Sequence, residues 1–98
     1  MSLVINIYYK GNNGSAYKFY KDMINSGLVQ KVRNEPGNIK YDYFSPINDS
    51  ETLLLIDEWK TADDLDAHHK SNMMSEIAHL RDKYKLSMHV EMFTRHKN

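Results

Sequence analysis

The sequence predicts one α+β domain whose elements run strand, helix, strand, strand, helix, strand. Four short segments are rich in β-branched and aromatic residues, which either alternate with polar residues or form continuous apolar runs. Two longer segments repeat apolar residues at steps of three and four residues. Clusters of glycine, proline, asparagine and serine separate these segments. A chain of 98 residues has room for a single core, so we expect one domain over residues 1–98.

The first strand is predicted over residues 3–9. The glycines and asparagines of residues 11–14 predict a turn after it. From residue 15 to about residue 33 the pattern predicts one amphipathic helix with Ser15 as its N-cap. Its apolar face holds Ala16, Phe19, Tyr20, Met23, Ile24 and Leu28. Pro36 and Gly37 then stop the helix and start a tight turn.

Two strands over residues 39–44 and 52–59 follow, joined by a polar loop, and they predict a hairpin. Thr61 and Asp64 have capping-box spacing and begin a second helical region, which we expect to break near Ser71. Its apolar positions continue at Met73, Ile77, Leu80 and Tyr84. Residues 86–93 alternate again and predict the last strand.

This βαββαβ order predicts the ferredoxin-like fold, an antiparallel sheet with both helical regions on one face. All four strands offer apolar or aromatic residues on both faces. The uncovered face would then be a larger apolar patch than soluble monomers usually expose. We therefore expect a homodimer in which a second subunit covers that face.

The amino-acid composition limits the kinds of binding partner and the cellular compartment that we expect. Thirteen basic residues balance thirteen acidic ones, which gives no general attraction for nucleic acid or an anionic membrane. No run approaches the ~20 apolar residues of a membrane span, and the N-terminus lacks a signal-peptide pattern. The chain has no cysteine, which excludes disulfides, thiolate metal sites and a cysteine nucleophile. We expect a cytoplasmic protein.

Histidine is the main candidate for chemistry, because no phosphate loop, zinc pair or nucleophile elbow occurs. The five histidines lack the spacing of metal ligands, so we expect no metal site. His68 lies on the apolar side of the second helical region, shortly after Trp59 closes the third strand. The simpler alternative is a buried structural histidine.

Trp59 and Asn6 each have two interpretations. Trp59 either stacks on an aromatic ligand or caps the core at the end of a strand. Asn6 interrupts an apolar strand, and on a covered face its amide would need hydrogen-bond partners. Solvent exposure is the alternative for Asn6.

Three motifs resemble the antibiotic biosynthesis monooxygenase family. They are Glu35-Pro36-Gly37-Asn38 before a tyrosine-rich strand, Asp57-Glu58-Trp59 at the end of the hairpin, and Ala67-His68 on the following helix. The resemblance implies a ferredoxin-like homodimer with its two sheets packed into a barrel. It also implies a pocket between sheet and helices, where members similar to quinol monooxygenases oxidise aromatic substrates with molecular oxygen and no cofactor.

The resemblance implies roles for five residues in such a site. His68 would accept or relay the proton of a phenol or quinol, and Trp59 would pack against the aromatic ring of the substrate. Asn6 would join them in the catalytic set, while Asn38 and Tyr41 would hydrogen-bond the substrate. A positioned base and donors to the developing anion are what this chemistry requires.

The family leaves other functions open. Its haem-degrading branch has an asparagine in the first strand, which Asn6 matches. However, the helix histidine of that branch is expected at Ala78, whereas this chain has His79 one residue later, and His68 stands where that branch has a tryptophan. Both differences argue against haem degradation. Another branch isomerises a phosphorylated sugar-like signal, autoinducer-2, and shares the turn motif and the helix histidine. A dimer that only binds a small molecule is the non-enzymatic alternative.

Overall fold

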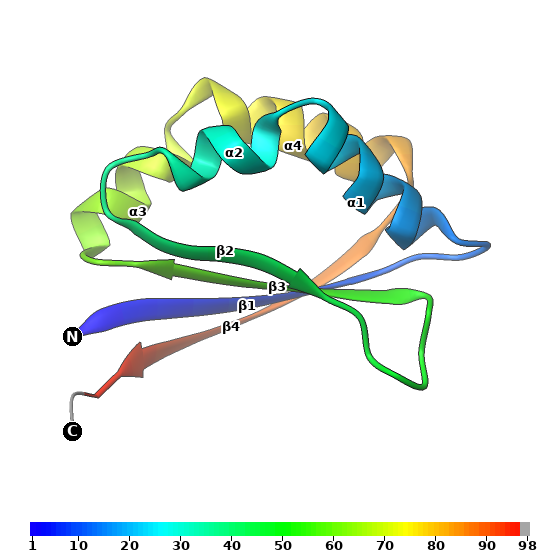
Figure 1. Ribbon diagram of the computed structural model, residues 1–98, viewed down its shortest axis with the longest axis horizontal. Coiled ribbons are helices and arrows are strands. Elements are labelled where there is room, and N and C mark those ends of the chain that lie inside the picture. The colour runs from blue at the N-terminus through cyan, green and yellow to red at the C-terminus, as the bar shows by residue number, and fades with distance from the viewer. Residues whose placement is uncertain (97–98) are drawn as a thin grey trace.

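The computed structural model describes residues 1–96, which form a four-stranded antiparallel sheet with helices along one side (Figure 1). The elements run β1 (Ser2–Lys10), α1 (Ser15–Asn25), α2 (Leu28–Arg33), β2 (Asn38–Phe44), β3 (Thr52–Trp59), α3 (Ala62–His69), α4 (Asn72–Lys83) and β4 (Ser87–Arg95). The strands lie in the order β2-β3-β1-β4. This confirms the predicted ferredoxin-like arrangement, and the sheet of the single chain is not closed.

The first helical segment is two helices, not the single helix that we expected. Gly27, with φ of 82°, separates α1 from α2. The expected N-cap is also one residue off, because Gly14 occupies that position with φ of 79°. Ser15 is instead the first residue of α1, and its hydroxyl accepts a hydrogen bond from the Asn12 amide at 3.0 Å. Both differences arise where glycine adopts a left-handed conformation that other residues avoid.

The second helical segment breaks where the sequence predicted. Thr61 caps α3 by accepting a hydrogen bond from the Asp64 amide at 3.1 Å, which satisfies a free donor of the first turn. The helix ends at His69, and Ser71 donates its hydroxyl to the His68 carbonyl at 2.7 Å. Helix α4 then begins at Asn72. The break places His68 in the last turn of α3, next to the sheet.

Strand register divides the sheet into two faces, because side chains alternate along a strand. Ile5 pairs with Asp57 and with Met92, whereas Asn6 pairs with Ile56 and with Glu91. The covered face, which packs under the helices, carries Ile5, Ile7, Tyr9, Tyr41, Leu55, Asp57 and Trp59. The open face carries Val4, Asn6, Tyr8, Phe44, Leu54, Glu58 and Phe93.

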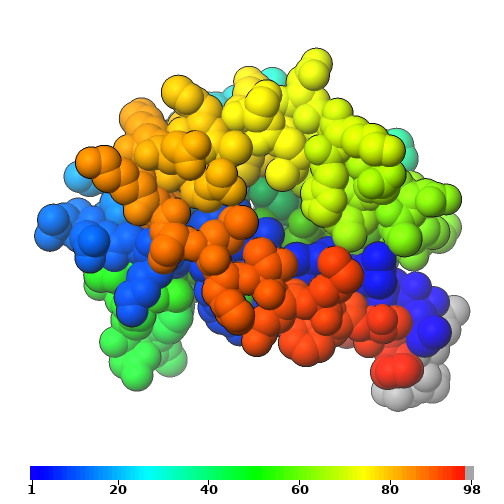
Figure 2. Space-filling view, turned by 180° about the vertical axis from the view of Figure 1, so that it is seen from behind, coloured from blue at the N-terminus to red at the C-terminus, as the bar shows by residue number. Residues whose placement is uncertain are grey.

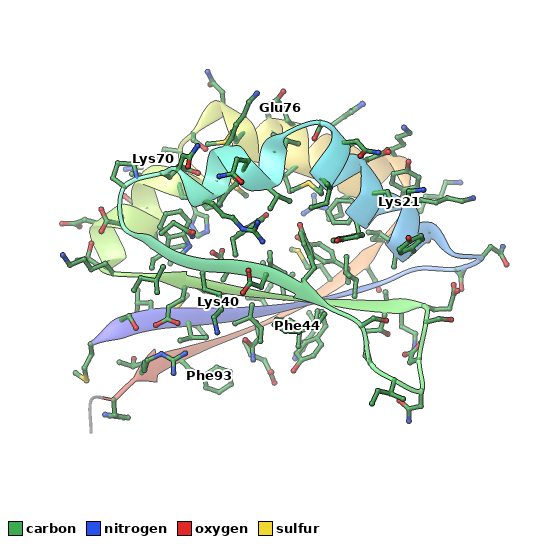
Figure 3. All side chains as sticks on the ribbon, viewed as in Figure 1. Lys21, Lys40, Phe44, Lys70, Glu76 and Phe93 are labelled. Carbon is green, nitrogen blue, oxygen red and sulfur yellow. The ribbon has the colours of Figure 1, made fainter. Side chains whose placement is uncertain are left out.

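The core lies between the covered face and the helices. Its fully buried side chains include Trp59 and Leu55 from β3 and Phe19, Met23 and Val32 from the helices. On the open face, Phe44 and Phe93 are 45 % and 51 % exposed, and both point away from the helices (Figure 3). Among residues 1–96, no helix is long and apolar enough to cross a membrane.

Candidate active site

A cavity of about 250 Å³ lies between the covered face and helices α3 and α4. Its apolar wall includes Ile5, Ile7, Leu55, Ile77, Met88 and Val90, and its polar groups are Tyr9, Tyr41, Asp57, His68, His69 and Arg81. Met88 and Met92 line the cavity yet remain 47 % and 57 % exposed. The mouth therefore opens beside β4, below α4 on the side of the molecule seen in Figure 2.

His68 is held in this wall by two neighbours. It is 3 % exposed, and its Nδ1 atom lies 2.7 Å from Oε1 of Glu35, in the turn after α2. Its ring stacks on that of Trp59, with centroids 4.7 Å apart and planes 26° from parallel. A neutral imidazole that donates Nδ1–H to the carboxylate keeps the lone pair of Nε2 free to accept a proton.

Asp57 is a buried carboxyl group in the same wall, 4 % exposed. Burial raises the pKa of Asp57 to about 7, and the negative charge of Glu35 adds to the rise. The indole N–H of Trp59 faces this carboxylate and lowers the pKa in part. It forms no well-aligned hydrogen bond, because within residues 1–96 Trp59 Nε1 and Asp57 Oδ1 both lack a partner.

Two tyrosines from the neighbouring strands line the same cavity as Asp57. Tyr41 of β2 is its direct register partner, and Tyr9 of β1 lines the same cavity. Burial raises the pKa of Tyr9 to about 12, and it raises the pKa of Tyr41 by a larger amount. Both side chains are therefore neutral phenols near pH 7. Arg81 of α4 adds a positive charge to the cavity wall, and this charge lowers the pKa of Tyr9 in part.

The structure brings together three of the five residues expected in the site. His68 and Tyr41 line the cavity, and Trp59 lies behind His68 with no exposed surface. Trp59 therefore supports the histidine ring and does not itself form the cavity wall.

The two asparagines lie elsewhere. Asn6 is on the open face, across the sheet from the cavity, and its Oδ1 atom is buried without a hydrogen-bond partner among residues 1–96. The Asn38 amide donates to the carbonyls of Lys40 at 3.2 Å and Glu58 at 3.5 Å. The register between β2 and β3 is irregular between Asn38 and Lys40, and these bonds bridge the irregularity. The Asn38 side chain therefore stabilises the start of β2 against β3.

Sequence reasoning missed Glu35, Asp57 and Arg81 as site residues. Glu35 belongs to the Glu35-Pro36-Gly37-Asn38 motif of the family resemblance, but no role in the site was predicted for its side chain. Asp57 precedes Trp59 by two residues, so strand alternation places both side chains on one face. That spacing was a usable signal. Within the described part of the chain, no three histidine, aspartate or glutamate side chains gather as a metal site would require.

A model of the antibiotic biosynthesis monooxygenase family matches residues 3–80 of the chain. The chain belongs to this family. The match runs from β1 into α4 and therefore includes every polar group of the cavity except Arg81. A comparison with curated proteins found no match.

Solved structures share the fold of this family member over nearly its whole length. A conserved protein from Methanosarcina mazei is 18 % identical, with a TM-score of 0.84, 98 % of this chain covered and 94 % of that one. A Pseudomonas aeruginosa protein is 19 % identical, with a TM-score of 0.80 and coverages of 98 % and 95 %. SnoaB from Streptomyces nogalater, a cofactor-independent oxygenase, is 10 % identical, with a TM-score of 0.81 and coverages of 99 % and 95 %.

Proposed function

We propose that this chain is a monooxygenase that oxidises a small phenol or quinol with molecular oxygen, and that His68 takes the hydroxyl proton. The observation that carries the proposal is the buried His68–Glu35 pair in the wall of an otherwise largely apolar cavity. A carboxylate that fixes the imidazole makes Nε2 the proton acceptor. Membership of the monooxygenase family and the likeness to SnoaB support the same reaction class.

The cavity suits a small flat ring. Its volume of about 250 Å³ is below the range of roughly 300–1,000 Å³ typical of drug-sized ligands. This favours a substrate of one or two rings. Met74, Met88 and Met92 contribute thioether groups, which make favourable contacts with aromatic rings. The Tyr41 hydroxyl is a neutral donor for a substrate oxygen that becomes negatively charged.

The proposed reaction needs only the substrate and oxygen. Loss of the hydroxyl proton to His68 gives a phenolate, which passes an electron to oxygen more readily than the neutral phenol does. One oxygen atom then bonds to a ring carbon that bears hydrogen, and the other leaves as water with the hydroxyl proton and the ring proton. The substrate supplies all the electrons that reduce oxygen, so the balance is complete without an external reductant.

We also propose that the working form is a homodimer joined through the open face. Val4, Tyr8 and Leu54 form an apolar surface there, with Phe44 and Phe93 at its margins. A second copy would remove this surface from water, which the helices of one chain do not do.

The test is oxygen uptake with a panel of hydroquinones, naphthols and simple phenols, in the presence of chelator and corrected for autoxidation. We expect protein-dependent uptake that falls by roughly 100- to 10,000-fold in His68→Ala, because the proton acceptor is lost. The matched control is His79→Ala, which removes an exposed histidine of α4 outside the cavity. Its rate should equal that of the wild type.

Two results would contradict the proposal. An unchanged rate in His68→Ala would exclude this histidine as the base. Saturable binding of the phenols without any oxygen consumption would show that the chain is a binding protein. In that case the His68–Glu35 pair would serve only to order the wall of the cavity.

A further inference from the structure

The proposed reaction moves two protons, and His68 accounts for only one of them. The hydroxyl proton goes to His68 when the phenolate forms. A second proton must leave the ring carbon that gains oxygen, and the departing oxygen atom must be protonated to become water. An acid in the wall of this largely apolar cavity can supply the proton for the second step.

We propose that Asp57 is a second catalytic residue, whose protonated carboxyl group donates a proton to the oxygen atom that leaves as water. This role rests on the monooxygenase function proposed above. Asp57 lines the cavity and is 4 % exposed. Its Oδ1 atom and the neighbouring Trp59 Nε1 have no partner among the described residues. Trp59 has no exposed surface, so of these two residues only Asp57, which lines the cavity, can reach a bound hydroperoxide.

The surroundings of Asp57 favour its neutral, proton-donating form. The ionisable groups that share its cavity or interact with its charge come from four elements and the turn after α2: Tyr9 of β1, Tyr41 and Tyr43 of β2, His68 and His69 of α3, Arg81 of α4 and Glu35 of the turn. Strand β4 contributes only Met88, Val90 and Met92 to this cavity. Within residues 1–96, no lysine or arginine forms an ion pair with Asp57.

Burial and the charge of Glu35 therefore act on Asp57 without a compensating ion pair, and they raise its pKa to about 7. An acid with a pKa near the working pH is an efficient proton donor that also recovers its proton. His68 and Asp57 line the same cavity, yet only His68 has a carboxylate partner. The different environments assign the base to His68 and the acid to Asp57.

The step balances with these two groups alone. The hydroperoxide on the ring carries the proton that His68 first removed. The bond between its two oxygen atoms breaks, and the outer oxygen takes the Asp57 proton and leaves as water. The ring C–H electron pair becomes the second bond of the new carbonyl group, and the ring proton restores the Asp57 carboxyl group. No oxidant other than oxygen and no reductant is needed.

The test measures how much of the consumed oxygen ends in quinone product. Asp57→Asn keeps the shape of the side chain but cannot give up a proton. We expect the fraction of oxygen that yields product to fall by at least about tenfold, with hydrogen peroxide released in its place. Asp66→Asn is the matched control, because Asp66 is an exposed aspartate of α3 that pairs with Lys70. It should retain the product fraction of the wild type.

The pH profile gives a second readout that a purely structural role would not change. In the wild type, the product fraction should fall as pH rises through about 7, because ionised Asp57 has no proton to donate. This decline should be absent from Asp57→Asn. If the variant shows the product fraction and pH profile of the wild type, the role of Asp57 is overturned while the oxygenase function stands.

Two further outcomes complete the test. If the wild type consumes no oxygen with any phenol or quinol, the proposed function fails and the role of Asp57 fails with it. A carbon-13 NMR titration of the aspartate carboxyl groups needs no variant and remains available if Asp57→Asn does not fold. One group titrating near neutral pH supports the proposal, whereas titration of every aspartate below about pH 5 overturns it.

Discussion

Two neighbouring carboxyl groups on opposite faces of the sheet have pKa values that are shifted in opposite directions. Asp57 and Glu58 are consecutive in β3 and are 4 % and 3 % exposed. On the open face, Arg95 donates to Glu58 at 2.8 and 3.0 Å and holds the pKa of Glu58 below its usual range. On the covered face, Asp57 has no such partner within residues 1–96, and its pKa rises. Burial with a cation preserves a charge, whereas burial without one favours the neutral acid.

The apolar residues of the same strand show a parallel contrast. Leu55 packs under the helices and is 1 % exposed, whereas Leu54 lies on the open face and is partly exposed. The covered face therefore stabilises the single chain and forms the cavity. The open face leaves apolar surface that association with a second copy can bury. Three predictions test this division, in order of decreasing effect.

The largest effect is expected from a charge placed on the apolar surface of the open face. Leu54→Lys should weaken the proposed homodimer by at least about 1,000-fold, since symmetry would bury two unpaired ammonium groups in one interface. Sedimentation equilibrium over a concentration series measures this change. Ile24→Lys is the control, because Ile24 is an exposed apolar residue of α1, 43 % exposed, and should leave association unchanged. A wild type that stays monomeric at every concentration would refute the dimer.

A leucine pair on opposite faces gives the next largest effect. Leu55→Ala should lower the free energy of unfolding by about 2–5 kcal/mol, because it leaves a cavity in the core. Leu54→Ala should cost about 1 kcal/mol or less in dilute solution, where the chain is monomeric and the site partly hydrated. Urea denaturation at low protein concentration measures both. Equal losses would mean that the open face contributes as much to folding as the covered face.

Sequence periodicity predicted the fold because secondary structure and strand faces are local properties. Alternation located all four strands, and the apolar steps and the cap at Thr61 located the helices. The break at Gly27 was not predicted, because an isolated glycine inside a helical pattern does not show whether it takes a positive φ. Tertiary packing decides that conformation.

The site was less predictable, because it depends on contacts between distant segments. His68 was found from its helix face and from the family motif. Its partner Glu35 lies 33 residues earlier in the chain, and no local pattern joins the two. Asn6 shows the complementary problem, since alternation places it opposite Ile5 and Ile7 but does not show which face the helices cover.

The smallest of the three effects is the pH dependence of stability, which should differ in sign between the two carboxyl groups. Unfolded Asp57 ionises near pH 4 and the folded group near 7, so stability falls as pH rises through this window. At about 1.4 kcal/mol per pKa unit, the limit is about 4 kcal/mol, and relaxation around the buried group reduces it toward about 2 kcal/mol. Asp57→Asn should abolish this fall. Urea denaturation at a series of pH values measures it.

Glu58→Gln is the matched variant on the open face, where the pH dependence of stability has the opposite sign. The folded pKa of Glu58 is lowered by Arg95, so the carboxylate stabilises the fold above its unfolded pKa and this contribution is lost as pH falls through the folded value. Glu58→Gln should therefore reduce the loss of stability in acid, while Asp57→Asn reduces the loss toward neutral pH. If both variants changed the pH profile in the same direction, Arg95 would not account for the difference between the two faces.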